Sequence, residues 1–273
     1  MPDNADISDI SDIPSALIQT LDGLLTPLGG RTALAAQRFG GDKAAIHLRG
    51  DDVFPAASLA KIPIAIELMR RIDLGQFAAT ERLDTSDEPR VGGGVLDWLD
   101  RDVPLTLHEL CTLMLITSDN TAANFLLGLL GMGEVNETMS RLKLKHTHLA
   151  RRFMDMAARA NHRDNETTAD DMLTLLTLLR GGALPGGRQI AEMLTGQLLF
   201  EELAAWLPAD AHLAHKTGSL GDTFHDAGLL SGPGGSCVYV VLTTGQATIP
   251  AARVAVCCAV RALWDAWCAD ISA

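Results

Sequence analysis

The chain has 273 residues, of which 47% are hydrophobic and 21% charged, a composition typical of a globular protein with one large core. The formal net charge of −12 argues against a nucleic-acid partner, because phosphate binding needs clustered lysine and arginine. No apolar stretch reaches the ~18 residues that a membrane-spanning helix needs, which argues against an integral membrane protein.

Residues 1–13 carry four aspartates and have neither the basic start nor the apolar run of a secretory signal. We predict a disordered acidic tail here. The sequence as written is therefore expected in the cytoplasm, or in the periplasm or medium if an export signal has been removed.

The cysteines and histidines show no metal-binding spacing, such as a CxxC pair or an HExxH helix. We expect buried free thiols, no metal and no other cofactor. The cysteines are Cys111, Cys237, Cys257, Cys258 and Cys268.

The hydrophobic periodicity predicts a helix over 13–25 and then two strands, 31–41 and 43–50, joined by a Gly-Gly turn. From Pro55 to about Phe200 the pattern is mainly helical, with helices expected at 58–72, 106–117, 121–131, 135–144 and 168–182. Three strands (212–219, 225–232, 236–245) and a closing helix from Pro250 follow.

This order predicts an α/β (α+β) fold in which both ends of the chain build one antiparallel sheet. Helices from both ends would flank the sheet, and a helical lobe would be inserted between its parts. We expect one catalytic domain over 14–273, with an α/β lobe at about 14–55 plus 208–273 and a helical lobe at about 56–207.

Ser58 and Lys61 stand three residues apart at the start of a predicted helix, so their side chains share one face. A serine here can cap the helix or act as a nucleophile. A lysine can accept the serine proton only if burial or neighbouring cations lower its pKa. Alone, this spacing favours a helix cap followed by a solvated lysine.

Two further polar clusters follow. Ser118-Asp119-Asn120 lies at a junction between predicted helices, where it could cap the second helix or direct a hydroxyl and an amide into a cleft. Lys216-Thr217-Gly218-Ser219 ends a predicted strand, where Gly218 permits close approach to the strand edge. A solvated strand end is the alternative interpretation.

Together, S-x-x-K, S-D-N and K-T-G resemble the penicillin-recognising serine hydrolases, and most closely the class A β-lactamases. The phrases LITSDNTAANFLL and AHKTGS are similar to that family as well, and the resemblance extends from about Thr32 to the C-terminus. It implies a β-lactamase/transpeptidase-like fold and a small-molecule substrate, a β-lactam or a D-alanyl peptide-like amide or ester.

The resemblance also implies roles for individual residues. Ser58 would be the acylated nucleophile, Lys61 its proton acceptor and Ser118 the proton shuttle to the leaving nitrogen. Asn120 would bind the substrate amide, and Lys216 and Thr217 its carboxylate. The backbone N–H groups of Ser58 and Ser219 would form the oxyanion hole.

The sequence differs from the class A family at the residue that carries out deacylation. Class A enzymes carry a glutamate that activates the hydrolytic water, and counting along the loop from Leu149 and back from Thr167 puts Phe153 at that position. Asp155 is the nearest carboxylate and is our candidate deacylation-loop residue. Arg151 and Glu166 match the family's loop-closing arginine and aspartate, so we expect an Arg151–Glu166 ion pair.

Three hypotheses remain. The first is a class A-type β-lactamase, with weak turnover if no other group replaces the glutamate. The second is a D-Ala-D-Ala carboxypeptidase-like or esterase-like hydrolase that deacylates β-lactams slowly. The third is a non-catalytic protein that keeps the fold. The complete motif set disfavours this third hypothesis. The sequence does not indicate an oligomeric state.

Overall fold

The computed structural model describes residues 15–40 and 44–269, so the segment 1–13, expected to be disordered, lies outside the described residues. The α-helices are α1 (Ser15–Leu25), α2 (Lys61–Asp73), α3 (Leu107–Ile116), α4 (Asn120–Leu130), α5 (Met132–Arg141), α6 (Met156–Ala160), α7 (Ala169–Arg180), α8 (Gly187–Thr195), α9 (Glu201–Trp206) and α10 (Ile249–Trp267). The strands are β1 (Arg31–Phe39), β2 (Ala45–Leu48), β3 (Phe54–Pro55), β4 (Arg82–Leu83), β5 (Leu105–Thr106), β6 (Glu166–Thr167), β7 (His212–Leu220), β8 (Thr223–Gly232) and β9 (Gly235–Thr244). Short 3-10 helices are η1 (Thr26–Leu28), η2 (Ala57–Ala60) and η3 (Val95–Asp97).

A five-stranded antiparallel sheet joins the two ends of the chain. Its order is β2-β1-β9-β8-β7, and β1 pairs with β9 along its whole length, for example Leu34 opposite Val241. Consecutive residues are buried in β1 (32–36) and in β9 (237–243), without the in–out alternation of a half-exposed strand, as expected for a sheet packed on both faces. The fold class predicted from the sequence is confirmed.

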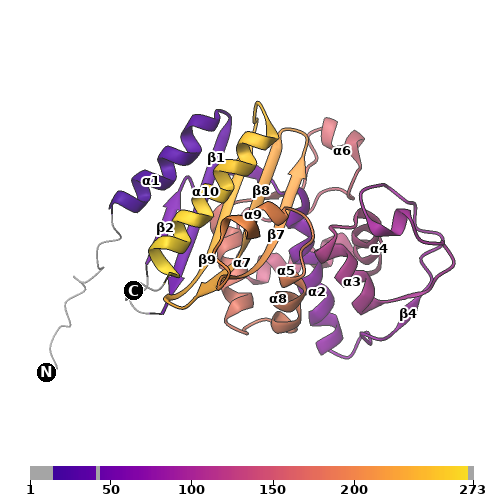
Figure 1. Ribbon diagram of the computed structural model, residues 1–273. Helices are drawn as coiled ribbons and strands as arrows, with labels where there is room; N and C mark the ends of the chain where they lie inside the picture. The colour runs from indigo at the N-terminus through magenta and orange to yellow at the C-terminus, as the bar shows by residue number, and fades with distance from the viewer. Residues whose placement is uncertain (1–14, 41–43, 270–273) are drawn as a thin grey trace, which may run out of the picture.

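The sheet separates two cores (Figure 1). On one face α1 and α10 pack together and bury residues such as Leu21, Tyr239 and Trp264. On the other face α7 covers β1 and β9, and the helices from α2 to α8 form the second core. None of the described helices combines the length and the apolar character needed to cross a membrane.

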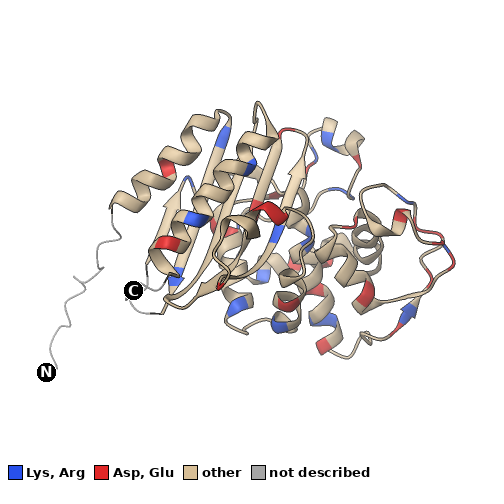
Figure 2. Ribbon diagram, in the orientation of Figure 1, with Lys and Arg blue, Asp and Glu red and all other residues tan. Residues whose placement is uncertain are grey.

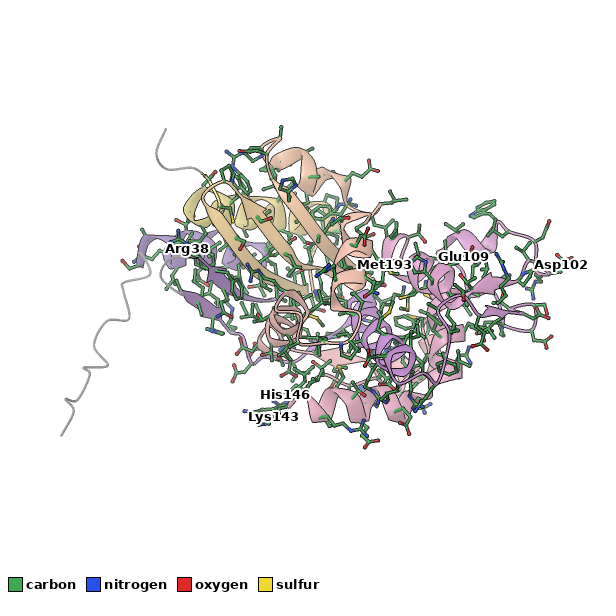
Figure 3. All side chains as sticks on the ribbon, turned by 90° about the horizontal axis from the view of Figure 1, so that it is seen from below. Arg38, Asp102, Glu109, Lys143, His146 and Met193 are labelled. Carbon is green, nitrogen blue, oxygen red and sulfur yellow. The ribbon has the colours of Figure 1, made fainter. Side chains whose placement is uncertain are left out.

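The helical part extends away from the sheet, and Figure 3 places Asp102 at its far tip and Arg38 at the opposite end, on the sheet. Acidic and basic residues gather on the loops between β4 and β5, whereas the sheet carries few of them (Figure 2). The catalytic candidates identified above come from both parts of the molecule, from the start of α2, from the α3–α4 junction and from β7.

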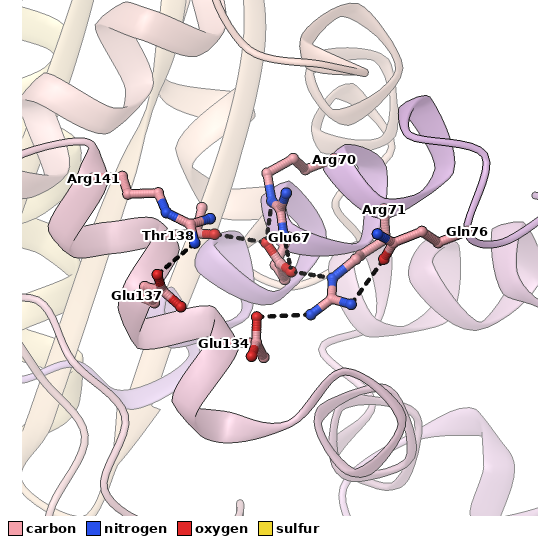
Figure 4. A network of polar contacts seen from close by, with 8 residues as sticks. All are labelled: Glu67, Arg70, Arg71, Gln76, Glu134, Glu137, Thr138 and Arg141. Carbon is pink, nitrogen blue, oxygen red and sulfur yellow. Dashed lines mark hydrogen bonds and ion pairs between the residues drawn. The ribbon is translucent and has the colours of Figure 1, made fainter.

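A buried carboxylate anchors α2, the helix that begins with Lys61 (Figure 4). Glu67 is fully buried and accepts hydrogen bonds from Arg70 and Arg71 on its own helix and from Thr138 on α5. Arg71 also pairs with Glu134 at 2.9 Å, which ties α5 to α2 a second time. These donors hold the pKa of Glu67 at about 2, although its burial acts in the opposite direction.

Candidate active site

Ser58 lies on η2, one residue after Ala57, whose backbone adopts a positive φ of 46°. The 3-10 turn continues directly into α2, so Lys61 occupies the first position of that helix. Lys61 is fully buried, and its Nζ lies 3.2 Å from Ser58 Oγ. Pro63 falls at the third position of α2, where its missing N–H has no intrahelical partner to lose.

Ser118 and Asn120 complete the surroundings of Lys61. The Nζ of Lys61 lies 2.9 Å from Ser118 Oγ, 2.5 Å from the Ser118 carbonyl oxygen and 2.7 Å from Asn120 Oδ1. Ser118 reaches this position through a left-handed backbone with φ of 57°. Asp119, between them, caps α4 by accepting the N–H of Ala122. In this triplet Asp119 therefore caps the helix, whereas the side chains of Ser118 and Asn120 lie beside Lys61.

Four oxygen atoms lie within hydrogen-bonding distance of Lys61 Nζ, whereas an ammonium group has only three protons to donate. Burial lowers its pKa well below 10.5, the Lys216 charge lowers it further, and Asp119 partly offsets both. A neutral amine has a lone pair that can accept a proton from Ser58 or Ser118. This geometry and the lowered pKa suit the role of proton acceptor that the sequence predicts for Lys61.

Lys216 and Thr217 lie on β7, the edge strand of the sheet. An added Cβ on Gly218 would lie 3.3 Å from Ala57 Cβ, so the glycine allows the turn carrying Ser58 to pack against this strand. Lys216 is fully buried and donates to the Thr217 carbonyl oxygen at 3.0 Å. Burial lowers its pKa to about 7.

These elements enclose a cavity of about 190 Å³. Its polar wall includes Ser58, Ser118, Asn120, Thr217 and Ser219. Its remaining lining residues are Ala57, Gly93, Arg151, Phe153, Met154, Leu199 and Leu220. Within the described part of the chain, no aspartate or glutamate lines this cavity.

Phe153 occupies the wall facing Lys61, with its ring centroid 4.8 Å from Nζ. Its backbone is held by Asn124 of α4, whose side chain accepts the Phe153 N–H at 2.8 Å and donates to the Phe153 carbonyl at 3.1 Å. The ring lies beside the lysine, where the family resemblance leads one to expect a carboxylate.

The predicted Arg151–Glu166 ion pair does not form, so this prediction is wrong. Arg151 pairs instead with Asp164, at 2.7 Å, and Arg159 approaches the same carboxylate at 3.1 Å. Glu166 lies in β6, where its backbone pairs with Pro55 and with His148, and its side chain points outward to within 3.9 Å of His148 Nε2. Strand pairing, rather than an ion pair, is what fixes Glu166.

Asp155 does not line the Ser58 cavity, where a deacylating residue would be expected. Its carboxylate caps α6 by accepting the N–H of Ala158 at 2.9 Å. It lines a neighbouring cavity on the other side of Phe153 and Met154, together with Glu88 and Arg152. Asp155 is thus engaged as a helix cap and is not among the residues that line the Ser58 cavity.

The sequence reasoning missed several residues of the site. Asn124, Gly93, Met154, Leu199 and Leu220 lie in or support the cavity without belonging to a motif. The run Gly92-Gly93-Gly94 was an available signal, because Asn120 Nδ2 donates to the Gly92 carbonyl at 2.9 Å and Gly93 lines the cavity. Asn124 lies inside the phrase LITSDNTAANFLL quoted above, whereas Met154, Leu199 and Leu220 carry no recognisable spacing.

A serine beside a buried lysine, a second serine and a cationic strand together define a serine hydrolase site. The model of the beta-lactamase enzyme family matches residues 16–267, and the chain belongs to this family. A beta-lactamase from Rhodobacter capsulatus is 30% identical over 247 residues, which cover 81% of this chain and 77% of that protein.

Solved structures agree with this assignment. A variant of the last common ancestor of Gram-negative class A beta-lactamases has a TM-score of 0.83 at 28% identity, covering 92% of this chain and 98% of that one. A mutant of PBP-A, solved as an acyl-enzyme complex with penicillin G, has a TM-score of 0.83 at 25% identity, covering 93% and 96%. The chain is a β-lactamase-like serine hydrolase of the class A type.

Proposed function

We propose that the protein is acylated at Ser58 by β-lactams and releases the acyl group slowly. The observation that carries this proposal is the Phe153 ring packed over Lys61, in a cavity without a carboxylate among its described lining residues. Acylation needs a nucleophile, a base and an oxyanion site, whereas release needs a base for water in addition.

In the acylation step, the neutral amine of Lys61 takes the proton of Ser58 as Oγ attacks the lactam carbonyl. The backbone N–H groups of Ser58 and Ser219 stabilise the developing oxyanion. Ser118, hydrogen-bonded to Lys61, passes a proton to the departing lactam nitrogen. Asn120 binds the amide of the acyl side chain, and Lys216 with Thr217 binds the carboxylate.

Release of the acyl group then depends on a water that must be deprotonated. Lys61 is the only basic side chain with direct contact to Ser58 among the described residues, and no carboxylate among the described residues lines the cavity to deprotonate a water. General-base assistance is typically worth about 10²–10⁴-fold in rate. The acyl-enzyme of this protein is therefore expected to persist far longer than its formation takes. The PBP-A mutant captured with penicillin G supports a stable acyl-enzyme on this fold.

The test is a time course of intact mass after mixing with penicillin G. We expect a mass increase equal to one penicillin, stable for minutes or longer, and absent from Ser58→Ala. Rapid substrate loss without an adduct would show efficient deacylation and overturn the slow-release part of the proposal. No adduct and no substrate loss at any concentration would overturn acylation itself.

A further inference from the structure

A buried carboxylate lies on the opposite side of β7 from the cavity, outside the site described above. Asp226 on β8 is fully buried. It accepts a hydrogen bond from the Tyr239 hydroxyl at 2.6 Å and lies 2.9 Å from His215 Nδ1. A buried ion is costly unless other charges compensate it, so its position in an otherwise apolar layer calls for an explanation.

The sheet register places this carboxylate next to the substrate-binding strand. Asp226 stands opposite Thr217, and Lys216 stands opposite Ala227. Because side chains alternate between the faces of a strand, Asp226 points toward α10 while Lys216 points toward the helical core. Asp226 and Lys216 are therefore neighbours across one layer of backbone.

Each of the two buried lysines has one buried carboxylate nearby that does not touch it. Asp119 raises the pKa of Lys61 against the effect of burial, and Asp226 does the same for Lys216. Among the described residues, Lys216 Nζ has only the Thr217 carbonyl as a hydrogen-bond acceptor. A single neutral acceptor is a weak partner for a desolvated ammonium group, which leaves the charge state of Lys216 dependent on more distant charges.

We propose that Asp226 is a positioning residue whose carboxylate, held by Tyr239 and His215, keeps Lys216 cationic so that it can bind the carboxylate of an anionic substrate. This inference rests on the proposed function, in which Lys216 contacts that carboxylate. Asp226 itself does not touch the substrate and acts through the charge of Lys216.

Other titratable groups near Lys216 do not replace Asp226. Lys61, on α2, carries no negative charge that could stabilise the Lys216 ammonium group. His225 shares the face of Lys216, but burial lowers its pKa to about 4, so it is neutral at pH 7. The remaining groups are His215 and Tyr239, which bind Asp226 directly, and Arg188, Glu192 and His212, which line a separate cavity between α8 and the start of β7.

The experiment compares penicillin G with its methyl ester, which lacks the negative charge. The acid/ester ratio of second-order acylation constants is measured between pH 5.5 and 9 for the wild type and Asp226→Asn. The protonated fraction of Lys216 at pH 7 is about one half if its pKa is about 7, and about one tenth if the pKa falls by about one unit. We therefore expect the ratio at pH 7 to fall about fivefold, with little change in ester acylation.

The control is Asp171→Asn, which removes a buried carboxylate from the helical part, where it accepts the N–H groups of Lys145 and His146. It should leave the acid/ester ratio unchanged. A second variant, Asp226→Leu/Tyr239→Phe, replaces the carboxylate and its hydroxyl partner by apolar groups together, which leaves no orphaned hydroxyl.

An unchanged ratio in a folded Asp226 variant overturns the inference, as does an equal loss of acid and ester acylation. If neither variant folds, Asp226 serves the fold rather than Lys216, and the inference is also overturned. Failure of the proposed function looks different, because then the wild type itself forms no adduct with either compound.

Discussion

Replacing Phe153 by glutamate would supply the base that this site lacks. The ring centroid of Phe153 lies 4.8 Å from Lys61 Nζ, so a carboxylate at the end of a side chain of similar length falls within reach of the lysine and of a water near Ser58. The two hydrogen bonds from Asn124 hold the backbone, not the ring, and survive the substitution.

The size of the effect follows from the chemistry of the missing group. A positioned general base typically adds about 10²–10⁴-fold, which corresponds to about 3–5 kcal/mol of barrier. Part of that gain is lost if the new carboxylate forms too close an ion pair with Lys61. We expect Phe153→Glu to deacylate about 10²-fold faster than Phe153→Gln, which has the same shape without the base.

The assay isolates deacylation from acylation. The enzyme is first converted to its penicillin adduct, free drug is removed, and the return of unmodified mass is followed over time for the wild type and both variants. Equal deacylation rates in Phe153→Glu and Phe153→Gln would refute the reasoning that a missing carboxylate at this position limits release. A faster rate in both would instead implicate the bulk of the ring.

Glu67→Gln should destabilise the fold by about 3 kcal/mol in urea unfolding at pH 7, because it removes the buried negative charge that pairs with two arginines. The folded-state pKa of Glu67 is about 2, against an ordinary 4.5. The contribution of Glu67 to the free energy of unfolding is therefore complete above pH 4.5 and is lost as the pH falls toward 2. Urea unfolding at several pH values measures this loss. Asp164→Asn should lower Tm more than Glu166→Gln, because Asp164 holds Arg151; the reverse order, in differential scanning fluorimetry, would restore the sequence-based pairing. Asp155→Ala should cost about 1 kcal/mol as a lost helix cap and leave the deacylation rate in the mass assay unchanged; a slower release would return Asp155 to the mechanism.

The sequence predicted those parts of the fold that follow from local periodicity. The strands at 31–39 and 45–48 and the three strands after Pro208 lie where alternation and turn residues placed them. The helix expected from Ser58 begins instead with a 3-10 turn, and the short helices α6, α8 and α9 were not predicted individually. In α6 and α9, five or six residues with one buried position carry too little periodicity to be recognised.

The Arg151 pairing could not be decided by counting residues, because Asp164 and Glu166 are only two positions apart. The structure decides it at β6, where Thr167 and the residue before the strand, Asn165, have buried side chains while Glu166 is half-buried and points the other way. Alternation in a strand of two residues is visible only once its partners, β3 and His148, are known. The position of Phe153, by contrast, followed from the loop count alone.

Phe153 affects the two halves of the reaction in opposite ways. A carboxylate about 4.8 Å from Lys61 Nζ would stabilise the ammonium form by about 3–4 kcal/mol at an effective dielectric constant of about 20. The phenyl ring offers the cation only a cation–π contact of about 0.5–2 kcal/mol and excludes water from it. The ring therefore leaves Lys61 closer to neutral and ready to take the Ser58 proton, while it removes the group that would activate water. On the proposed function, one aromatic side chain in this place therefore accounts both for acylation at neutral pH and for slow release of the acyl group.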